Sequence, residues 1–315
     1  MKYRLVLTYG RICYIRLYLY FSALLLNLSE LSCRHIATSS IILSSIYSGL
    51  VLTFFKETQV SKDLNGKVAV IAGGGKNLGA LIAHELQSVG ASGFVLHYNS
   101  GSSKAETEKT AAALREKGAD TIIFQGDLSV ADNNNKLFDL AKSHFGAVHI
   151  GINTAGVVIK KPILEVTEAD YNKSFDANSK AAFFFLQQAG RVLEDRGSIV
   201  TIVSSLLAAY TPFYSIYPGS KAPVEHYTRA ASKEFGDRGI SVNAVGPGPM
   251  DTPFFYGQEN ADSTAYNKAG AALSKYSKTG LTDIEDIAPL IRFLVTEGWW
   301  ITGQTIFANG GYTTR

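Results

Sequence analysis

The sequence predicts an α/β domain built on a doubly wound parallel sheet. From residue 64 onward, apolar runs of strand length alternate with segments of helical length. The first of these runs, Val68–Ala72, leads into a glycine-rich turn that opens a helix. A composition of 46% hydrophobic and 18% charged residues is typical of globular proteins, and 315 residues accommodate one large α/β domain or two small ones.

The first strand and its turn predict a dinucleotide-binding site. Gly73, Gly74 and Gly75 let the backbone turn tightly and approach phosphate groups without an intervening β-carbon. The helix expected over residues 78–89 then presents free N–H groups and a partial positive charge to the anion. The alternative is a glycine turn that serves packing alone, as in many α/β proteins.

The second strand, Gly93–Tyr98, arrives at the spacing expected of a βαβ unit, and its end bears on the type of cofactor. An acidic residue about 20 positions past the glycines typically holds the ribose 2′-hydroxyl of NAD, but Asn99 and Ser100 follow this strand instead. Lys76 adds a cation on the same side. NADP(H) is therefore favoured over NAD(H), unless Lys76 and Lys104 are only solvated surface residues.

The remaining segments continue the alternation and predict an open parallel sheet with helices on both faces. Further helices are expected over residues 104–117 and 133–145, and further strands over residues 121–125, 149–153, 198–203, 240–245 and Thr305–Ala308.

Tyr217 and Lys221 are four positions apart, which places a phenol and an ammonium on one face if a helix starts there. They follow a strand that ends in Ser204 and Ser205, so hydroxyls at its carboxyl end can face the phenol across a ligand crevice. A tyrosine pKa near 10 suits acid–base catalysis at neutral pH poorly, and we expect the ammonium and a nicotinamide charge to lower it. The alternative is an ordinary surface pair.

Together these motifs resemble the short-chain dehydrogenase/reductase family over essentially all of residues 64–315, with similarity to its 3-oxoacyl-[acyl-carrier-protein] reductase-like members. The resemblance implies a Rossmann fold and a nicotinamide cofactor. The family's glycine turn corresponds to residues 72–79, with Asn77 in place of a glycine, and its Asn-Asn-Ala-Gly segment corresponds to residues 153–156. The predicted cofactor-binding residues are Gly73, Lys76, Asn77, Leu78, Gly79, Asn99, Ser100, Asp127, Leu128, Asn153, Ala155, Gly156, Tyr217, Lys221, Pro247, Gly248, Met250 and Thr252.

The resemblance also implies the catalytic roles. Tyr217 is the acid/base, and Lys221 binds the nicotinamide ribose and lowers the tyrosine pKa. Asn178 holds a water that links the lysine to solvent. A serine orients the substrate, and the family's usual offset favours Ser204 slightly over Ser205. The side chain of Asn77 is expected to cap the helix or to touch the phosphate.

The predicted function is an NADPH-dependent carbonyl reductase, or the reverse alcohol dehydrogenase, acting on a small molecule such as a 3-oxoacyl thioester or a cyclic aromatic ketone. The alternative is a redox-sensing NADP-binding module. Residues 251–278 form a candidate substrate lid whose aromatic residues suggest an apolar or planar substrate. The histidines lack metal-ligand spacing, so no metal site is expected. The family often forms dimers or tetramers, and residues 183–186 are candidate interface residues.

Residues 1–63 read as a separate extension, and residues 64–315 as the single domain. The extension carries seven basic and three acidic residues, a net charge of +4, and the remainder of the chain carries −1 of the total +3. The mild basicity therefore belongs to the extension and does not indicate nucleic-acid binding. Both cysteines, Cys13 and Cys33, also lie there. Three interpretations stay open: membrane association through residues 1–55, a targeting peptide, or a segment without function. The expected location is the cytoplasm, or a membrane in the first case.

Overall fold

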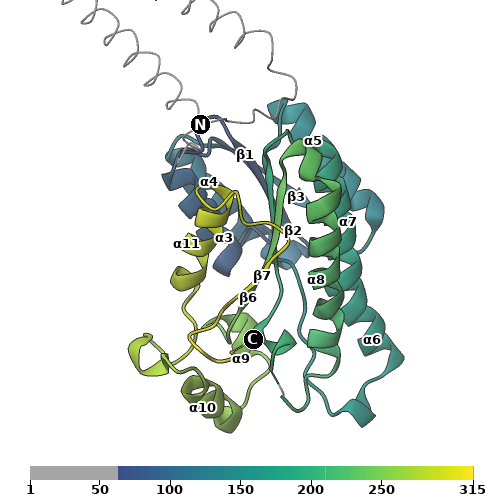
Figure 1. Ribbon diagram of the computed structural model, residues 1–315, viewed down its shortest axis with the longest axis vertical. Coiled ribbons are helices and arrows are strands. Elements are labelled where there is room, and N and C mark those ends of the chain that lie inside the picture. Colours follow the sequence, from purple (N-terminus) through teal and green to yellow (C-terminus); the bar gives the residue numbers. More distant parts are fainter. Residues whose placement is uncertain (1–62, 210, 315) are drawn as a thin grey trace, which may run out of the picture. The chain divides into compact units, whose positions relative to one another are not determined.

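The computed structural model describes residues 63–209 and 211–314, which contain a seven-stranded parallel sheet (Figure 1). The strand order β3-β2-β1-β4-β5-β6-β7 is that of a doubly wound Rossmann sheet, so the predicted fold class is confirmed. The strands are β1 (Val68–Ala72), β2 (Gly93–Tyr98), β3 (Asp120–Gln125), β4 (Ile150–Asn153), β5 (Ser198–Ile202), β6 (Ser241–Pro247) and β7 (Thr305–Ala308).

The strand order reverses between β1 and β4, which places a ligand crevice at their carboxyl ends. Ala72, the last residue of β1, pairs with Asn153, the last residue of β4. The glycine turn and the segment that follows β4 therefore leave the sheet side by side.

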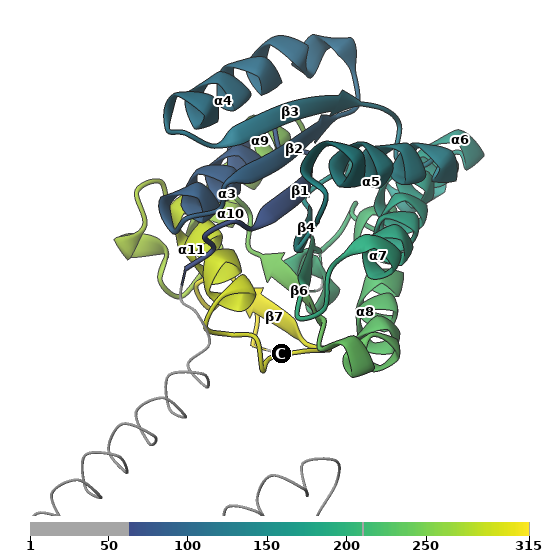
Figure 2. The same ribbon diagram turned by 90° about the horizontal axis from the view of Figure 1, so that it is seen from above.

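Helices cover both faces of the sheet (Figure 2). The helices on one face are α3 (Asn77–Ser88), α4 (Lys104–Glu116) and α11 (Ile284–Val295), and those on the other are α5 (Ala131–Phe145), α7 (Ala181–Val192) and α8 (Ile216–Glu234). A shorter helix, α6 (Glu168–Phe175), leads through a π-helical turn into α7.

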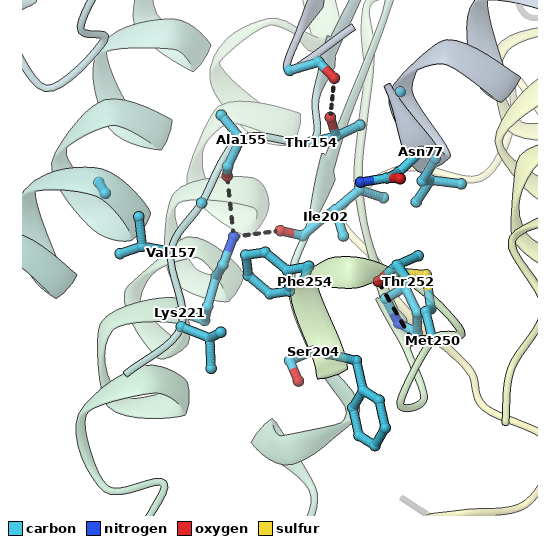
Figure 3. Close-up of a pocket in the computed structure, with 18 of the residues that line it drawn as sticks. Asn77, Thr154, Ala155, Val157, Ile202, Ser204, Lys221, Met250, Thr252 and Phe254 are labelled. Atoms are coloured by element: carbon cyan, nitrogen blue, oxygen red, sulfur yellow. Dashed lines mark hydrogen bonds between the residues drawn. The ribbon is translucent and has the colours of Figure 1, made fainter. Parts of the chain in front are cut away.

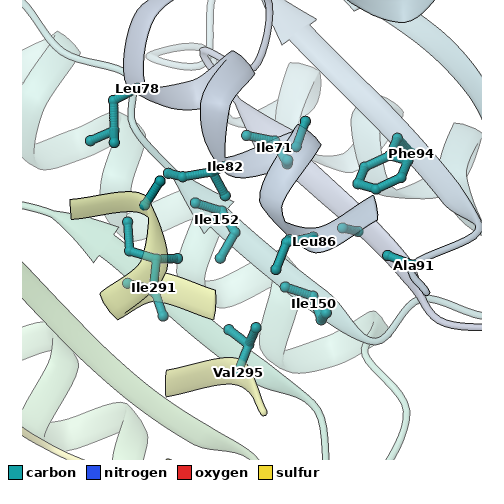
Figure 4. Close-up of a cluster of buried hydrophobic side chains, with 14 of the residues drawn as sticks. Ile71, Leu78, Ile82, Leu86, Ala91, Phe94, Ile150, Ile152, Ile291 and Val295 are labelled. Atoms are coloured by element: carbon teal, nitrogen blue, oxygen red, sulfur yellow. The ribbon is translucent and has the colours of Figure 1, made fainter. Parts of the chain in front are cut away.

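Each face of the sheet has its own apolar core. On the first face, Ile82 and Leu86 of α3 pack with Ile71 of β1 and Ile291 of α11, all fully buried (Figure 4). On the second face, the rings of Phe138 in α5 and Phe185 in α7 meet edge to face, with centroids 5.1 Å apart. Burying side chains of this size stabilises the fold by about 1.5–3 kcal/mol each, so the strand ends are held on a rigid base.

The candidate lid segment contains two helices that the sequence analysis did not predict, α9 (Pro253–Tyr256) and α10 (Ala261–Gly270). Proline stands at the start of α9, where its missing N–H costs nothing. Asn260 and Ser263 form a reciprocal capping box that begins α10. Local capping, rather than apolar periodicity, produces these two helices.

The interpretations of residues 1–62 lie outside the described residues. Among the helices that the structure describes, none combines the length and the apolar character needed to span a bilayer.

Candidate active site

A cavity lies at the carboxyl ends of the central strands and brings together the glycine turn, the ends of β4 to β6 and the lid segment. Every predicted site residue lines this cavity except Asn153 and Asn178. Those two lie directly behind its wall and bond to residues that do line it. The topology therefore gathers residues from widely separated segments of the chain into one site.

The glycine turn packs so closely on its neighbours that side chains do not fit. A β-carbon on Gly73 would lie 2.6 Å from Oγ1 of Thr154, and the φ of +72° at Gly73 belongs to the left-handed region. A β-carbon on Gly75 would collide with Thr107. The Thr154 hydroxyl in turn donates to the carbonyl of Ala72 at 2.8 Å. The turn is thus a cradle of bare backbone, which is the form that a pyrophosphate requires.

Asn77 does not play the capping role considered for it, because the N-cap of α3 is Lys76 and no side chain caps that helix end. Asn77 instead adopts a φ of +48°. Asparagine tolerates this left-handed region better than most other residues, which explains how it replaces a glycine in the turn.

At the end of β2, the cavity wall carries hydroxyl and amide groups and no carboxylate. Asn99, Ser100 and Ser103 line this part. Nζ of Lys76 donates to Oγ of Ser103 at 3.3 Å and lies 3.6 Å from a carboxylate oxygen of Glu106. That ion pair is half exposed and therefore weak, so Lys76 remains available to another anion.

His97 joins two cofactor-side loops, a role that the sequence analysis missed. Its Nδ1 accepts from the backbone N–H of Gly73 at 3.2 Å, and its Nε2 donates to the carbonyl of Gly126 at 2.7 Å. Burial lowers the pKa of His97 to about 4, so the ring is neutral. The detectable signal was a histidine near the carboxyl end of an otherwise apolar strand.

The side chain of Ser204 lies beside Tyr217 and lowers the pKa of the phenol, which separates the two candidate serines. The hydroxyl of Ser205 instead donates to the carbonyl of Gly246 at 3.0 Å in a fully buried position. Burial raises the pKa of Tyr217 to about 12, and Ser204 offsets this only in part.

Lys221 points its ammonium at two backbone carbonyls (Figure 3). Nζ donates to the carbonyl oxygen of Ile202 at 2.9 Å and to that of Ala155 at 3.4 Å. Burial lowers the pKa of Lys221 to about 8. In the protein alone, burial dominates the phenol, and the ammonium of Lys221 is directed at the backbone. The expected lowering of the Tyr217 pKa by Lys221 and the nicotinamide charge together stays a prediction.

Asn178 lies in the π-helical turn Asp176–Lys180 and fixes the wall of the cavity. Its Oδ1 accepts from the N–H of Val157 at 2.9 Å, and its Nδ2 donates to the carbonyl of the same residue at 2.8 Å. Such turns occur often at functional sites. Asn153 supports the same segment, since its Oδ1 accepts from the N–H of Ala155 at 3.0 Å.

The side of the cavity around Tyr217 is aromatic. The ring centroids of Tyr214 and Phe254 lie 6.4 and 6.5 Å from that of Tyr217. Phe255 lines the cavity, whereas Tyr256 lies outside the lining and its hydroxyl donates to Asp251. The lining residues on this side that the sequence analysis did not identify are Thr211, Tyr214 and Tyr312, whereas Gln258 and Asn267 belong to the predicted lid segment.

Comparisons with known proteins agree with this architecture. A family model described as "Enoyl-(Acyl carrier protein) reductase" matches residues 73–313. The chain is 34% identical to the short chain dehydrogenase/reductase nsrJ of Aspergillus novofumigatus over 79% of this chain and 96% of that protein. It is 32% identical to the hydroxynaphthalene reductase-like protein Arp2 of Metarhizium brunneum over 81% of this chain and 98% of the relative.

A solved structure is also similar. A protein from Burkholderia cenocepacia, described as a dehydrogenase and crystallised with bound NADP, superposes with a TM-score of 0.81 and 60% identity over 84% of this chain and 99% of that one. These matches extend along nearly the whole described domain, and they agree with the sheet order, the glycine turn and the helix that carries Tyr217 and Lys221. The chain therefore belongs to the short-chain dehydrogenase/reductase family.

Proposed function

We propose that this protein is an NADP(H)-dependent carbonyl reductase, working in reverse as an alcohol dehydrogenase, on a ketone or secondary alcohol. The observation that carries the proposal is the placement of Ser204 beside Tyr217 in a cavity that continues past Lys221 to the glycine turn. A hydroxyl pair of this kind can hold and protonate a carbonyl oxygen.

The residues present fit NADP(H). Gly73 and Gly75 line the cavity with bare backbone, which suits the pyrophosphate, and Lys76, Asn99 and Ser100 suit a ribose 2′-phosphate. The cofactor supplies or removes a hydride at the substrate carbon. NADP in the Burkholderia cenocepacia structure, which is 60% identical, supports the same cofactor here.

Tyr217 provides the proton for reduction. With a pKa of about 12 it is protonated at neutral pH, which is the form that can donate to a ketone oxygen. Ser204 donates a hydrogen bond to the same oxygen and so fixes its position. Lys221 is a buried cation near this centre, and its charge stabilises negative charge that develops on the phenol during proton transfer.

Among ketones, we propose a cyclic aromatic compound ahead of a 3-oxoacyl thioester. Tyr214 and Phe254 flank Tyr217 and offer ring faces and edges to a planar molecule. A relative that covers most of the chain is named a hydroxynaphthalene reductase-like protein, which supports the same class.

The proposal is tested by following NADPH and NADH oxidation by the full chain with three probes: a bicyclic aromatic ketone, a 3-oxoacyl thioester and a small polar ketone. We expect turnover with NADPH and the highest kcat/KM for the aromatic ketone. Preference for the small polar ketone would overturn the substrate class. NADPH binding without turnover of any probe would favour the redox-sensing module instead.

A further inference from the structure

We infer that Glu259 is a positioning residue of the substrate site. Its carboxylate fastens the segment that carries α9 and α10 to the body of the domain and fixes the ring of Tyr214 beside Tyr217. The inference rests on the proposed function, because it takes the space beside Tyr217 to be where the substrate binds.

Glu259 is engaged at both carboxylate oxygens. Nζ of Lys160 lies 2.5 Å from Oε2, and the hydroxyl of Tyr214 donates to Oε1. The Glu259 side chain has no exposed surface, and that of Lys160 is only 17% exposed. Burial alone would raise the pKa of Glu259, but the bonds from Lys160, Ser263 and Tyr214 outweigh it and hold the pKa below its ordinary value. Charges are buried in this way only when they are paired and hydrogen-bonded.

The three partners come from three separate segments. Lys160 lies in the segment after β4, Tyr214 lies just before α8, and Glu259 lies between α9 and α10. The first two segments are also joined by the backbone bond from the N–H of Lys161 to the carbonyl of Phe213 at 2.8 Å. Glu259 adds the lid segment to this pair.

The far end of the lid segment has its own attachment. The N–H of Leu273 donates to the carbonyl of Gly310, and the hydroxyl of Tyr312 donates to Asn267 of α10 at 3.3 Å. Before the segment, Met250 forms a β-bridge with Thr282. Loss of the Glu259 contacts would therefore release the stretch between these two attachments, which carries Phe254.

The contacts of Glu259 also decide which part of Tyr214 faces the substrate. Tyr214 lines the cavity, whereas Lys160 and Glu259 lie behind it. Because the Tyr214 hydroxyl is bonded to Glu259, the cavity receives its ring. Nζ of Lys160 lies 5.3 Å from the centroid of that ring, where its charge attracts the ring face. Glu259 thus acts through Tyr214 without reaching the substrate.

The test compares Glu259→Gln with Glu285→Gln in the full chain. Glu285 forms an exposed ion pair with Lys278 at 3.1 Å, so it controls for the substitution itself. We expect Glu259→Gln to raise KM for the aromatic ketone about tenfold, with KM for NADPH changed by less than about twofold. Hydrogen exchange of peptides within residues 251–262 should become about 30-fold faster, because the local opening equilibrium shifts. Glu285→Gln should change none of these quantities.

A second variant keeps the inference testable if Glu259→Gln folds poorly. Tyr214→Phe removes one hydroxyl and keeps the ring, and it should also speed exchange within residues 251–262. Adding Lys160→Met to Glu259→Gln removes the cation left unpaired and should restore part of the protection.

Unchanged exchange in both Glu259→Gln and Tyr214→Phe would overturn the inference. So would a uniform loss of stability with KM for the ketone unaltered, which is the result of a merely structural ion pair. Exchange is measured without turnover, so failure of the wild-type chain to reduce any ketone would count against the proposed function alone. The exchange rates of the variants would still test whether the Glu259 contacts hold the lid segment.

Discussion

Gly156 lies directly against Lys221: a β-carbon on this glycine would be 3.1 Å from the lysine Nζ. The same β-carbon would be 2.7 Å from Oδ1 of Asn178. The segment after β4 therefore passes between the buried lysine and the asparagine that anchors Val157. Lys221 keeps its position because this backbone carries no side chain there.

We expect Gly156→Ala to displace the Lys221 ammonium and to lower kcat/KM for the ketone about 100-fold, as small displacements in active sites do. Steady-state kinetics with NADPH measures this. Gly236→Ala is the matched control, because a β-carbon at Gly236 meets no atom within 4 Å and should leave kinetics unchanged. Wild-type kinetics in Gly156→Ala would show that the position of Lys221 does not depend on this contact.

Ser204→Ala and Ser205→Ala should act on different quantities. Removing the Ser204 hydroxyl takes away a donor beside Tyr217, so kcat should fall about 100-fold. Removing the Ser205 hydroxyl leaves the Gly246 carbonyl without this partner, so the free energy of unfolding should fall by about 1–2 kcal/mol. Kinetics and thermal unfolding of both variants separate the two effects, and the reverse pattern would assign the catalytic role to Ser205.

His97 should make the protein less stable in mild acid. The unfolded chain binds a proton at this histidine near pH 6.5, whereas burial lowers the folded pKa to about 4. Between these values the unfolded state binds more protons than the folded state. The contribution of His97 to the free energy of unfolding is therefore fully present above pH 6.5 and falls as the pH drops toward 4. The loss attributable to His97 is about 3 kcal/mol. Denaturant unfolding across this range, compared with His97→Gln, measures it; parallel pH profiles would contradict it.

Lys76 should discriminate between the two cofactors. We expect Lys76→Met to raise KM for NADPH about tenfold and to leave KM for NADH nearly unchanged, because only NADPH carries the 2′-phosphate. Lys104→Met is the control, since Lys104 does not line the cavity. An equal rise for both cofactors would place Lys76 against a phosphate that they share.

The elements predicted most accurately from the sequence carry local signals. The bounds of β1, β2 and β7 agree with their predictions, because apolar runs with flanking glycines or polar residues mark them. The helices α9 and α10 were not predicted, because they depend on a proline and a capping box rather than on an apolar face.

The residues of the candidate site were likewise predictable only where the sequence carries a local signal. Tyr217 and Lys221 are recognisable from spacing within one helix, and the structure places both on the cavity. Tyr214 and Tyr312 meet there only because distant segments fold together, so no local sequence pattern predicts them. The pKa of Tyr217 depends on burial, which spacing along the chain does not reveal.

The most direct test of the proposed reductase is the comparison of the full chain with its Tyr217→Phe variant, which removes the transferable proton and nearly preserves shape. NADPH oxidation with the bicyclic aromatic ketone is measured beside the Kd for NADPH. We expect kcat to fall about 1,000-fold while Kd changes by less than about twofold. Equal turnover by the two proteins would contradict the assignment of Tyr217 as the acid, and equal NADPH binding with no turnover by either would contradict the reductase itself.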